Sequence, residues 1–244
     1  MIVSTPLLNV QFPGNALQVY SVMITVATFD ILPTDLFYPT LFPLPEDDHA
    51  YNDKFNDLGF GSTYFVGNFG SALLGVLWVL ICYMIYPIAS CCTKSKCCVR
   101  YAKNLRGSLF WNGSILLIQE AYLDIMICCL INIREITIKV DTIGGALSIF
   151  LSVLLLICCI SLPIFTIVYI RPRYNELREP HLKDRFESIY EMIDLNGNKS
   201  AVMWPVLFCL RRALFALAVV YTNNVVLQLM AFTFPTLAVV ILVG

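Results

Sequence analysis

Long apolar segments without charge constrain this chain more than any other feature of its sequence. The hydrocarbon core of a bilayer is about 30 Å thick, so a helix that rises about 1.5 Å per residue needs roughly 20 mostly apolar residues to cross it. The segment from Phe69 to Ala89 meets this condition, and no charged residue lies between Asp57 and Lys94. Of the whole chain, 58% is hydrophobic and 14% is charged, whereas soluble domains are about 25% charged. We therefore expect a membrane protein and not an enzyme.

The same length test predicts an all-α fold, a polytopic transmembrane helix bundle of about five spans. The stretch from Ala213 to Gly244 would measure about 48 Å if its roughly 32 residues formed one helix, which is too long for a single span. Two helices that meet at the polar residues 222–224 are therefore expected. The predicted spans are 69–89, 109–133, 145–170, 203–222 and 225–244.

The charges of the loops predict how this bundle is oriented. Loops 90–107 and 171–200 are rich in lysine and arginine, which are retained on the cytoplasmic side of a membrane. Residues 1–61 are then expected on the extracellular or lumenal side, and a transmembrane domain is expected over 62–244. Because the apolar run continues to Gly244, and because no signal peptide is recognised at Met1, we expect a segment that is truncated at both ends.

Two further helices are predicted outside the spans. Near 18–32, an apolar segment ending before Pro33 predicts a short interfacial helix. Near 176–194, apolar residues at helical spacing predict an amphipathic helix that lies along the membrane or against partner helices. Its apolar positions are Leu182, Phe186, Ile189, Tyr190 and Ile193.

The second predicted span carries polar residues at membrane depth, namely Gln119, Glu120 and Asp124. In a continuous helix, a spacing of four places both carboxylates on one face. Acids inside a membrane usually meet a counter-charge, an ion or a water-filled cavity. Two readings stay open: these residues bind a cation such as Ca²⁺ and act in gating, or they pair with Arg211 and Arg212 of the fourth predicted span. The arginines could also extend toward the interface.

Four of the ten cysteines form two vicinal pairs next to a span and to basic residues, at Cys91, Cys92, Cys97 and Cys98. Cysteines in this setting are often palmitoylated, and the neighbouring lysines attract anionic lipid headgroups. Unmodified thiols are an equal alternative. A zinc site is less expected, because vicinal cysteines fit tetrahedral coordination less readily than a C-x-x-C pattern.

Other functions find no support in the sequence. A net charge of -1 and a pI near 6.1 predict no nucleic-acid partner. Phosphate loops, zinc-protease helices and nucleophile elbows do not occur, so no catalytic residue is predicted and the only non-protein groups expected are a cation and bound lipids. The glycosylation sequons at Asn112 and Asn198 fall on the predicted cytoplasmic side and predict no glycan.

Several segments of the chain together resemble one family. They are PLLNVQFPGNALQVYSVMITVATFDILPTD, FNDLGFGSTYFVGNFGS, FWNGSILLIQEAYLDIMICCLINI, YNELREPHLKDRFESIYEMI and RRALFALAVVY. The family is the transient-receptor-potential-like (TRP-like) membrane domain at the C-terminal end of large ciliate surface proteins, which is more distantly similar to fungal TRP-like and flavin-carrier proteins. The resemblance covers nearly the whole chain and rests on an overall pattern.

The resemblance implies a TRP-like cation-channel subunit, or its sensor-like transmembrane module, in a plasma or ciliary membrane. Its partners would be membrane lipids and either copies of itself or a larger membrane complex. In that reading Glu120 and Asp124, with Gln119, coordinate a cation or pair with the two arginines. Two alternatives stay open: a non-conducting membrane anchor or assembly subunit of a larger complex, and a lipid or small-molecule transporter.

Overall fold

The computed structural model describes the greater part of the chain. The described residues are Leu7, Leu8, Ala16, Gln18, Val19, Val22, 43–45, 48–57, 59–68, 79–88, 112–135, 142–191 and 199–243. Their secondary structure is helical, and no strand occurs among them. The predicted all-α class is therefore confirmed for this part of the chain.

Within the described ranges, two helices are long and apolar enough to cross a membrane, Ile143–Glu176 and Ala201–Tyr221. The first consists of α9 (Ile143–Phe165), a π-helical turn η3 (Thr166–Ile170) and a 3-10 turn η4 (Arg171–Glu176). The second contains the end of η5 (Lys199–Met203) and all of α11 (Trp204–Tyr221).

A third membrane-crossing helix is present if two bent segments count as one span. These are α7 (Ser114–Glu120) and α8 (Tyr122–Glu135), whose axes differ by 70°. The structure thus confirms two or three helices that could span a membrane, while the total of about five stays a prediction. In the described part of the predicted span 109–133, the helix is broken at Ala121.

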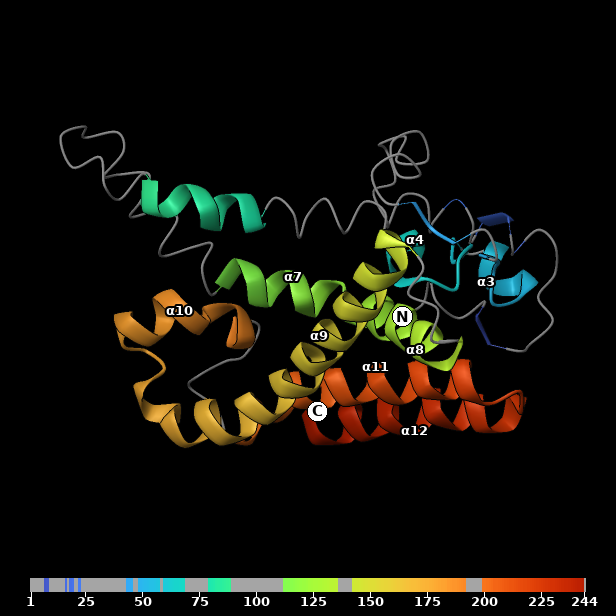
Figure 1. The fold of residues 1–244 in the computed structure, drawn as a ribbon. Helices are drawn as coiled ribbons and strands as arrows, with labels where there is room; N and C mark the ends of the chain where they lie inside the picture. The colour runs from blue at the N-terminus through green and yellow to red at the C-terminus, as the bar shows by residue number, and fades with distance from the viewer. Residues whose placement is uncertain are drawn as a thin grey trace.

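The chain turns back where the sequence predicted a hairpin. Thr222 adopts an extended conformation directly after α11, and α12 (Val225–Val243) runs back along α11 (Figure 1). Two polar side chains fix this turn: Asn224 Oδ1 accepts a hydrogen bond from the N–H of Val226 at 2.9 Å, and the buried amide of Gln228 donates to the carbonyl of Thr222 at 2.6 Å.

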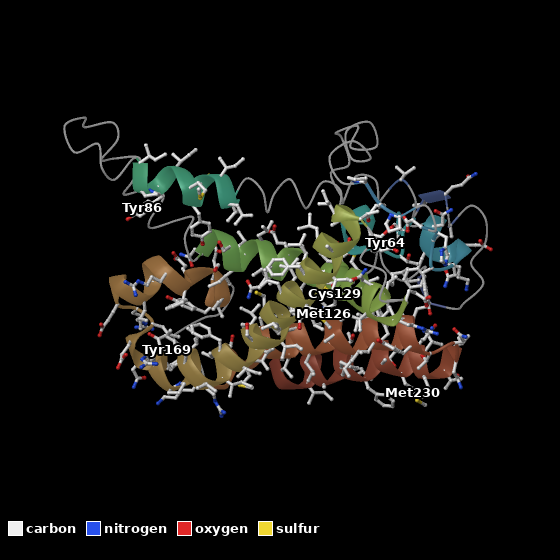
Figure 2. All side chains as sticks on the ribbon, in the orientation of Figure 1. Tyr64, Tyr86, Met126, Cys129, Tyr169 and Met230 are labelled. Atoms are coloured by element: carbon white, nitrogen blue, oxygen red, sulfur yellow. The ribbon has the colours of Figure 1, made fainter. Side chains whose placement is uncertain are left out.

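The core of the bundle is built around α8, which packs against α4 (Phe65–Asn68), α7, α9 and α11. Figure 2 shows Met126 and Cys129 of α8 near the centre of the molecule, where α9 crosses it, and both are buried. By contrast, Met230 on α12 points away from the bundle (Figure 2). Large apolar side chains are exposed on the outer sides of α9, α11 and α12, including Phe150, Ile157, Leu210, Phe234 and Ile241. Such an apolar exterior is what a lipid environment favours.

The segment that contains α3 (Asp53–Asp57) and α4 is fastened to one end of this core by polar contacts. The N–H of Val66 donates to Ser148 Oγ at 3.1 Å, and Asn132 Nδ2 donates to the carbonyl of Thr63 at 3.3 Å. At the start of α9, a side chain on Gly144 would place its Cβ 2.5 Å from the carbonyl oxygen of Pro43. Only glycine permits this close approach of two backbone segments.

The predicted amphipathic helix is present as α10 (Pro180–Tyr190). Leu182, Phe186, Ile189 and Tyr190 are buried in a cluster with Ile170 and Leu177, at the end of the long helix that contains α9. Figure 2 shows Tyr169 in this region, beside α10. Of the two environments expected for this helix, packing against other helices is therefore the one observed for these residues.

Other predicted features lie partly or wholly outside the described residues. Within the predicted first span only 79–88 is described, and it is the apolar helix Val79–Ile88. The predicted interfacial helix is described only at Gln18, Val19 and Val22. Loop 90–107, with Cys91, Cys92, Cys97 and Cys98, lies entirely outside the described part.

Candidate functional site at a helix bend

The bend between α7 and α8 interrupts the backbone hydrogen bonds of a helix without any proline or glycine in the interrupted turn. The N–H of Ala121 still bonds to the carbonyl of Leu117, and the ladder resumes when the N–H of Ile125 bonds to the carbonyl of Ala121. Among the described residues, no N–H of 122–124 donates to a carbonyl of 118–120. The bend therefore leaves carbonyl groups at the C-terminal end of α7 without their helical donors.

Arg212 of α11 supplies donors to this bend. Its Nη1 lies 2.9 Å from the carbonyl oxygen of Gln119 and 3.2 Å from that of Glu120. The guanidinium also lies over the ring of Phe208, one turn earlier on α11, at 4.0 Å from the ring centroid. A cation at the C-terminal end of a helix is favoured by the partial negative charge of the last carbonyls. Because kinks arise where a side chain inserts into the hydrogen-bond ladder, Arg212 accounts for the bend.

The two acids do not form the ion pairs that were one of the two readings. Asp124 interacts electrostatically with Arg212, but no charged groups of Glu120, Asp124, Arg211 and Arg212 approach within 4.0 Å in the described structure. Both acidic side chains are exposed among the described residues. Because the helix breaks between them, their spacing of four no longer places them on one face. Glu120 takes part through its carbonyl oxygen.

Arg211 is the predicted residue that the structure leaves at the edge of this group. It is half-buried, and its Nε is buried without a hydrogen-bond partner. Its positive charge repels that of Arg212. The Nε of Arg212 also lacks a partner. The structure thus brings Gln119, Glu120, Asp124 and Arg212 together and places Arg211 beside them.

A second group, which the sequence reasoning missed, lies at the C-terminal end of α11, whereas Arg212 lies in its middle. Arg134 Nη1 and the hydroxyl of Tyr51 both donate to the carbonyl of Val220. The guanidinium of Arg134 also lies 5.2 Å from the ring centroid of Tyr51 and 5.6 Å from that of Tyr221. Burial raises the pKa of the Tyr51 hydroxyl, and the nearby Arg134 opposes this increase only in part. Arg134 directly follows the predicted span 109–133, and nothing in its spacing connects it to α11.

A third missed contact lies inside the bundle, at a proline in α9. Pro163 has no N–H to donate to the carbonyl of Cys159 four residues earlier. The hydroxyl of Tyr122 on α8 donates to this carbonyl at 3.2 Å. The proline could have indicated the free carbonyl from sequence, although it could not have indicated which donor reaches it.

Neither a metal site nor a known relative helps to assign this site. In the described ranges, no three His, Cys, Asp or Glu side chains are grouped so that they could hold a metal ion. No family model, no curated protein and no solved structure matches the chain. The TRP-like resemblance therefore stays a prediction, and the arrangement itself shows a positive charge of one helix held at the break of another.

Proposed function

We propose that the chain is the sensor-like transmembrane module of a TRP-like cation-channel subunit. The observation that carries this proposal is the contact between Arg212 on the fourth predicted span and the broken second span. A charge held between two helices of an apolar bundle is a coupling point, because moving α11 must exchange its hydrogen bonds. The proposed orientation keeps residues 1–61 outside and 171–200 in the cytoplasm of a plasma or ciliary membrane, with lipids and further subunits as partners.

A comparison of the electrical and hydrogen-bond energies at Arg212 favours a sensor with a weak dependence on voltage. Moving one elementary charge through the full membrane field is worth about 2.3 kcal/mol per 100 mV. The two hydrogen bonds of Arg212 to carbonyls together contribute about 3–6 kcal/mol, at about 1.5–3 kcal/mol for each bond to a charged group. The field alone therefore biases this contact without breaking it. We expect a shallow dependence on voltage, in which a second stimulus contributes to opening.

The proposal is tested by current recordings from membranes that contain the intact protein. Wild type should carry a cation current, and Arg212→Gln should shift the voltage of half-maximal current. The matched control is Arg173→Gln, because Arg173 also combines a carbonyl contact (Tyr169, 3.3 Å) with an aromatic ring (Tyr169, 4.0 Å) but lies beyond α9, away from the bend. The proposal fails if no protein-dependent current flows, or if Arg212→Gln and Arg173→Gln behave alike.

The same current recordings test the roles of the two acidic residues, Glu120 and Asp124. Asp124→Asn should change the current more than Glu120→Gln, because the charge of Asp124 interacts with Arg212, whereas Glu120 contributes only its carbonyl to the contact. Currents that are unchanged when both acids are neutralised together would remove the carboxylates from the site.

A specific observation also favours the second candidate, a non-conducting anchor or assembly subunit. The hydrogen bonds of Arg212 go to backbone carbonyls, and a helix lock needs nothing more. In that case Arg212→Gln lowers the stability of the bundle, and no variant or wild type carries current. A protein that purifies as one copy among unlike chains would support this candidate.

A further inference from the structure

The bend between α7 and α8 has the chemical character of a cation-binding site. Two carbonyl oxygens, those of Gln119 and Glu120, have lost their helical N–H donors and converge on one point, the Nη1 of Arg212. They belong to the C-terminal end of a helix, where the partial charge is negative. Interrupted membrane helices coordinate alkali cations through carbonyls of this kind.

Asp124 brings a negative charge to the neighbourhood of these two carbonyls. It lies at the start of α8, directly after the bend, and interacts electrostatically with the guanidinium. Carbonyl and carboxylate oxygens are ligands for hard cations and not for soft metals. The described groups thus combine two neutral oxygens with one carboxylate, which matches a single positive charge.

The guanidinium of Arg212, which lies at these two carbonyls, is incompletely hydrogen-bonded there. One nitrogen of Arg212 serves both carbonyls, and its Nε is buried without a hydrogen-bond partner. An unbonded buried donor of a charged group carries a desolvation penalty. Arg212 is therefore attached to the site by its charge more than by full hydrogen bonding, and it can be exchanged for another cation.

We infer that the α7–α8 bend is an alkali-cation site, formed by the carbonyls of Gln119 and Glu120 and the carboxylate of Asp124, which Arg212 occupies in this structure. When α11 withdraws Arg212, a Na⁺ or K⁺ ion takes its place and the charge of the site is conserved. A divalent ion would leave one positive charge uncompensated. The inference goes beyond the proposed function, because it holds whether or not the protein conducts.

Thermal unfolding of the purified protein in lipid nanodiscs tests this inference without any current. The melting temperature is measured while Na⁺ or K⁺ replaces tetramethylammonium at constant ionic strength, since tetramethylammonium cannot donate hydrogen bonds. In Arg212→Ala the site is vacated, so the melting temperature should rise saturably, by about 3–6 °C at ten times the dissociation constant. Guanidinium at concentrations far below denaturing ones should have the same effect.

The controls separate binding at the bend from a general salt effect. Wild type and Arg173→Ala should not respond, because Arg212 still fills the site in both. The double variant Arg212→Ala with Asp124→Asn should lose the response. If Arg212→Ala does not fold, the same cation titration is made with Arg212→Gln. Its neutral amide replaces only part of the hydrogen bonding of Arg212, so the site still lacks a cation.

Three results would overturn the inference. One is the lack of a saturable response in both Arg212 variants, and another is an equal response in wild type. The third is stabilisation by Ca²⁺ alone, which would contradict the charge balance. Because the readout is stability without a membrane potential, its failure is distinguishable from failure of the channel proposal.

Discussion

At the scale of single residues, four carbonyl groups stand out because a side chain from another helix donates to each of them. Arg212 serves the bend after α7, Tyr122 serves the carbonyl that Pro163 leaves free, and Arg134 serves the end of α11. In a membrane, water cannot satisfy such groups, so irregular helices persist only where neighbouring side chains replace the missing donors. These contacts explain how the bundle tolerates a break, a proline and a helix end.

The first prediction concerns the stability that Arg212 contributes. Arg212→Gln should lower the free energy of unfolding by about 2–4 kcal/mol, because it removes charge-assisted hydrogen bonds and leaves the carbonyls of Gln119 and Glu120 without this donor. Arg173→Gln should cost about 1 kcal/mol or less, since its carbonyl partner, that of Tyr169, lies only four residues earlier in its own segment. Denaturant unfolding in detergent compares the two variants, and equal losses would contradict a special role for the bend.

The second prediction is a coupling between Tyr122 and Pro163. Tyr122→Phe should cost about 1 kcal/mol in wild type, because the carbonyl of Cys159 loses the hydrogen bond from the Tyr122 hydroxyl. In a Pro163→Ala background the new backbone N–H can bond to this carbonyl, so the same change should cost close to nothing. A double-mutant cycle measures the difference. Additive effects of the two substitutions would show that the hydroxyl does not compensate for the proline.

The residues also show how far sequence reasoning reaches. It selected Gln119, Glu120, Asp124 and Arg212 because polar groups are costly at membrane depth, and the structure brings these four together. It did not predict that backbone carbonyls, and not carboxylates, would receive the arginine. That outcome depends on the break at Ala121, and nothing in the local sequence marks it, because alanine, tyrosine and leucine there would all continue a helix.

At the scale of helices, the longest one is longer than a membrane requires. Ile143–Glu176 has 34 residues and would measure about 51 Å, well over the hydrocarbon thickness of about 30 Å. Its last turns carry Arg171 and Arg173 and pack against α10 (Figure 1). We therefore place α10 and the end of this helix outside the hydrocarbon core, on the proposed cytoplasmic side.

The third prediction concerns the pH dependence of this α10 region. Burial raises the pKa of Tyr190 to about 12, and its hydroxyl donates to the carbonyl of Leu177 at 2.9 Å. Because the pKa is higher in the folded state than the ordinary value of about 10, folding favours the neutral hydroxyl. The stability from this group is therefore complete below about pH 10 and is lost as the pH rises through about 12.

Unfolding of wild type and Tyr190→Phe between pH 9 and pH 12 would test this expectation. The wild type should lose stability over the upper part of the range. The variant should start from lower stability, since the hydrogen bond is absent, and should depend less on pH. Parallel pH curves for the two proteins would assign the alkaline loss to other groups.

Helix existence and type were the most predictable part of the fold. The apolar runs over 145–170 and 203–222 correspond to α9 with η3 and to α11, since long uncharged segments have few alternatives. The separation of α11 from α12 followed from the polar residues between them. The insertion of α4 against α8 and α9 was not predicted, because it depends on contacts of Ser148 and Asn132 with segments far away in sequence.

At the scale of the whole molecule, α8 is enclosed while the outer sides of α9, α11 and α12 remain apolar and exposed. α11 is connected to the α7–α8 bend at its middle, through Arg212, and to α8 at its C-terminal end, through the contact of Arg134 with Val220. A helix held in this way can move only if both contacts rearrange. The sensor-like proposal therefore makes a claim about α11: its charged part shifts relative to the bend when the membrane field changes.

Voltage-dependent fluorescence from α11 tests this claim most directly. A fluorescent amino acid replaces Leu210, which is exposed and lies two residues before Arg212, and its emission is recorded while the membrane potential is stepped. The account predicts a graded, shallow change of emission with voltage that shifts along the voltage axis in Arg212→Gln and keeps its midpoint in Arg173→Gln. Emission from the wild type that stays constant across the voltage range would contradict it.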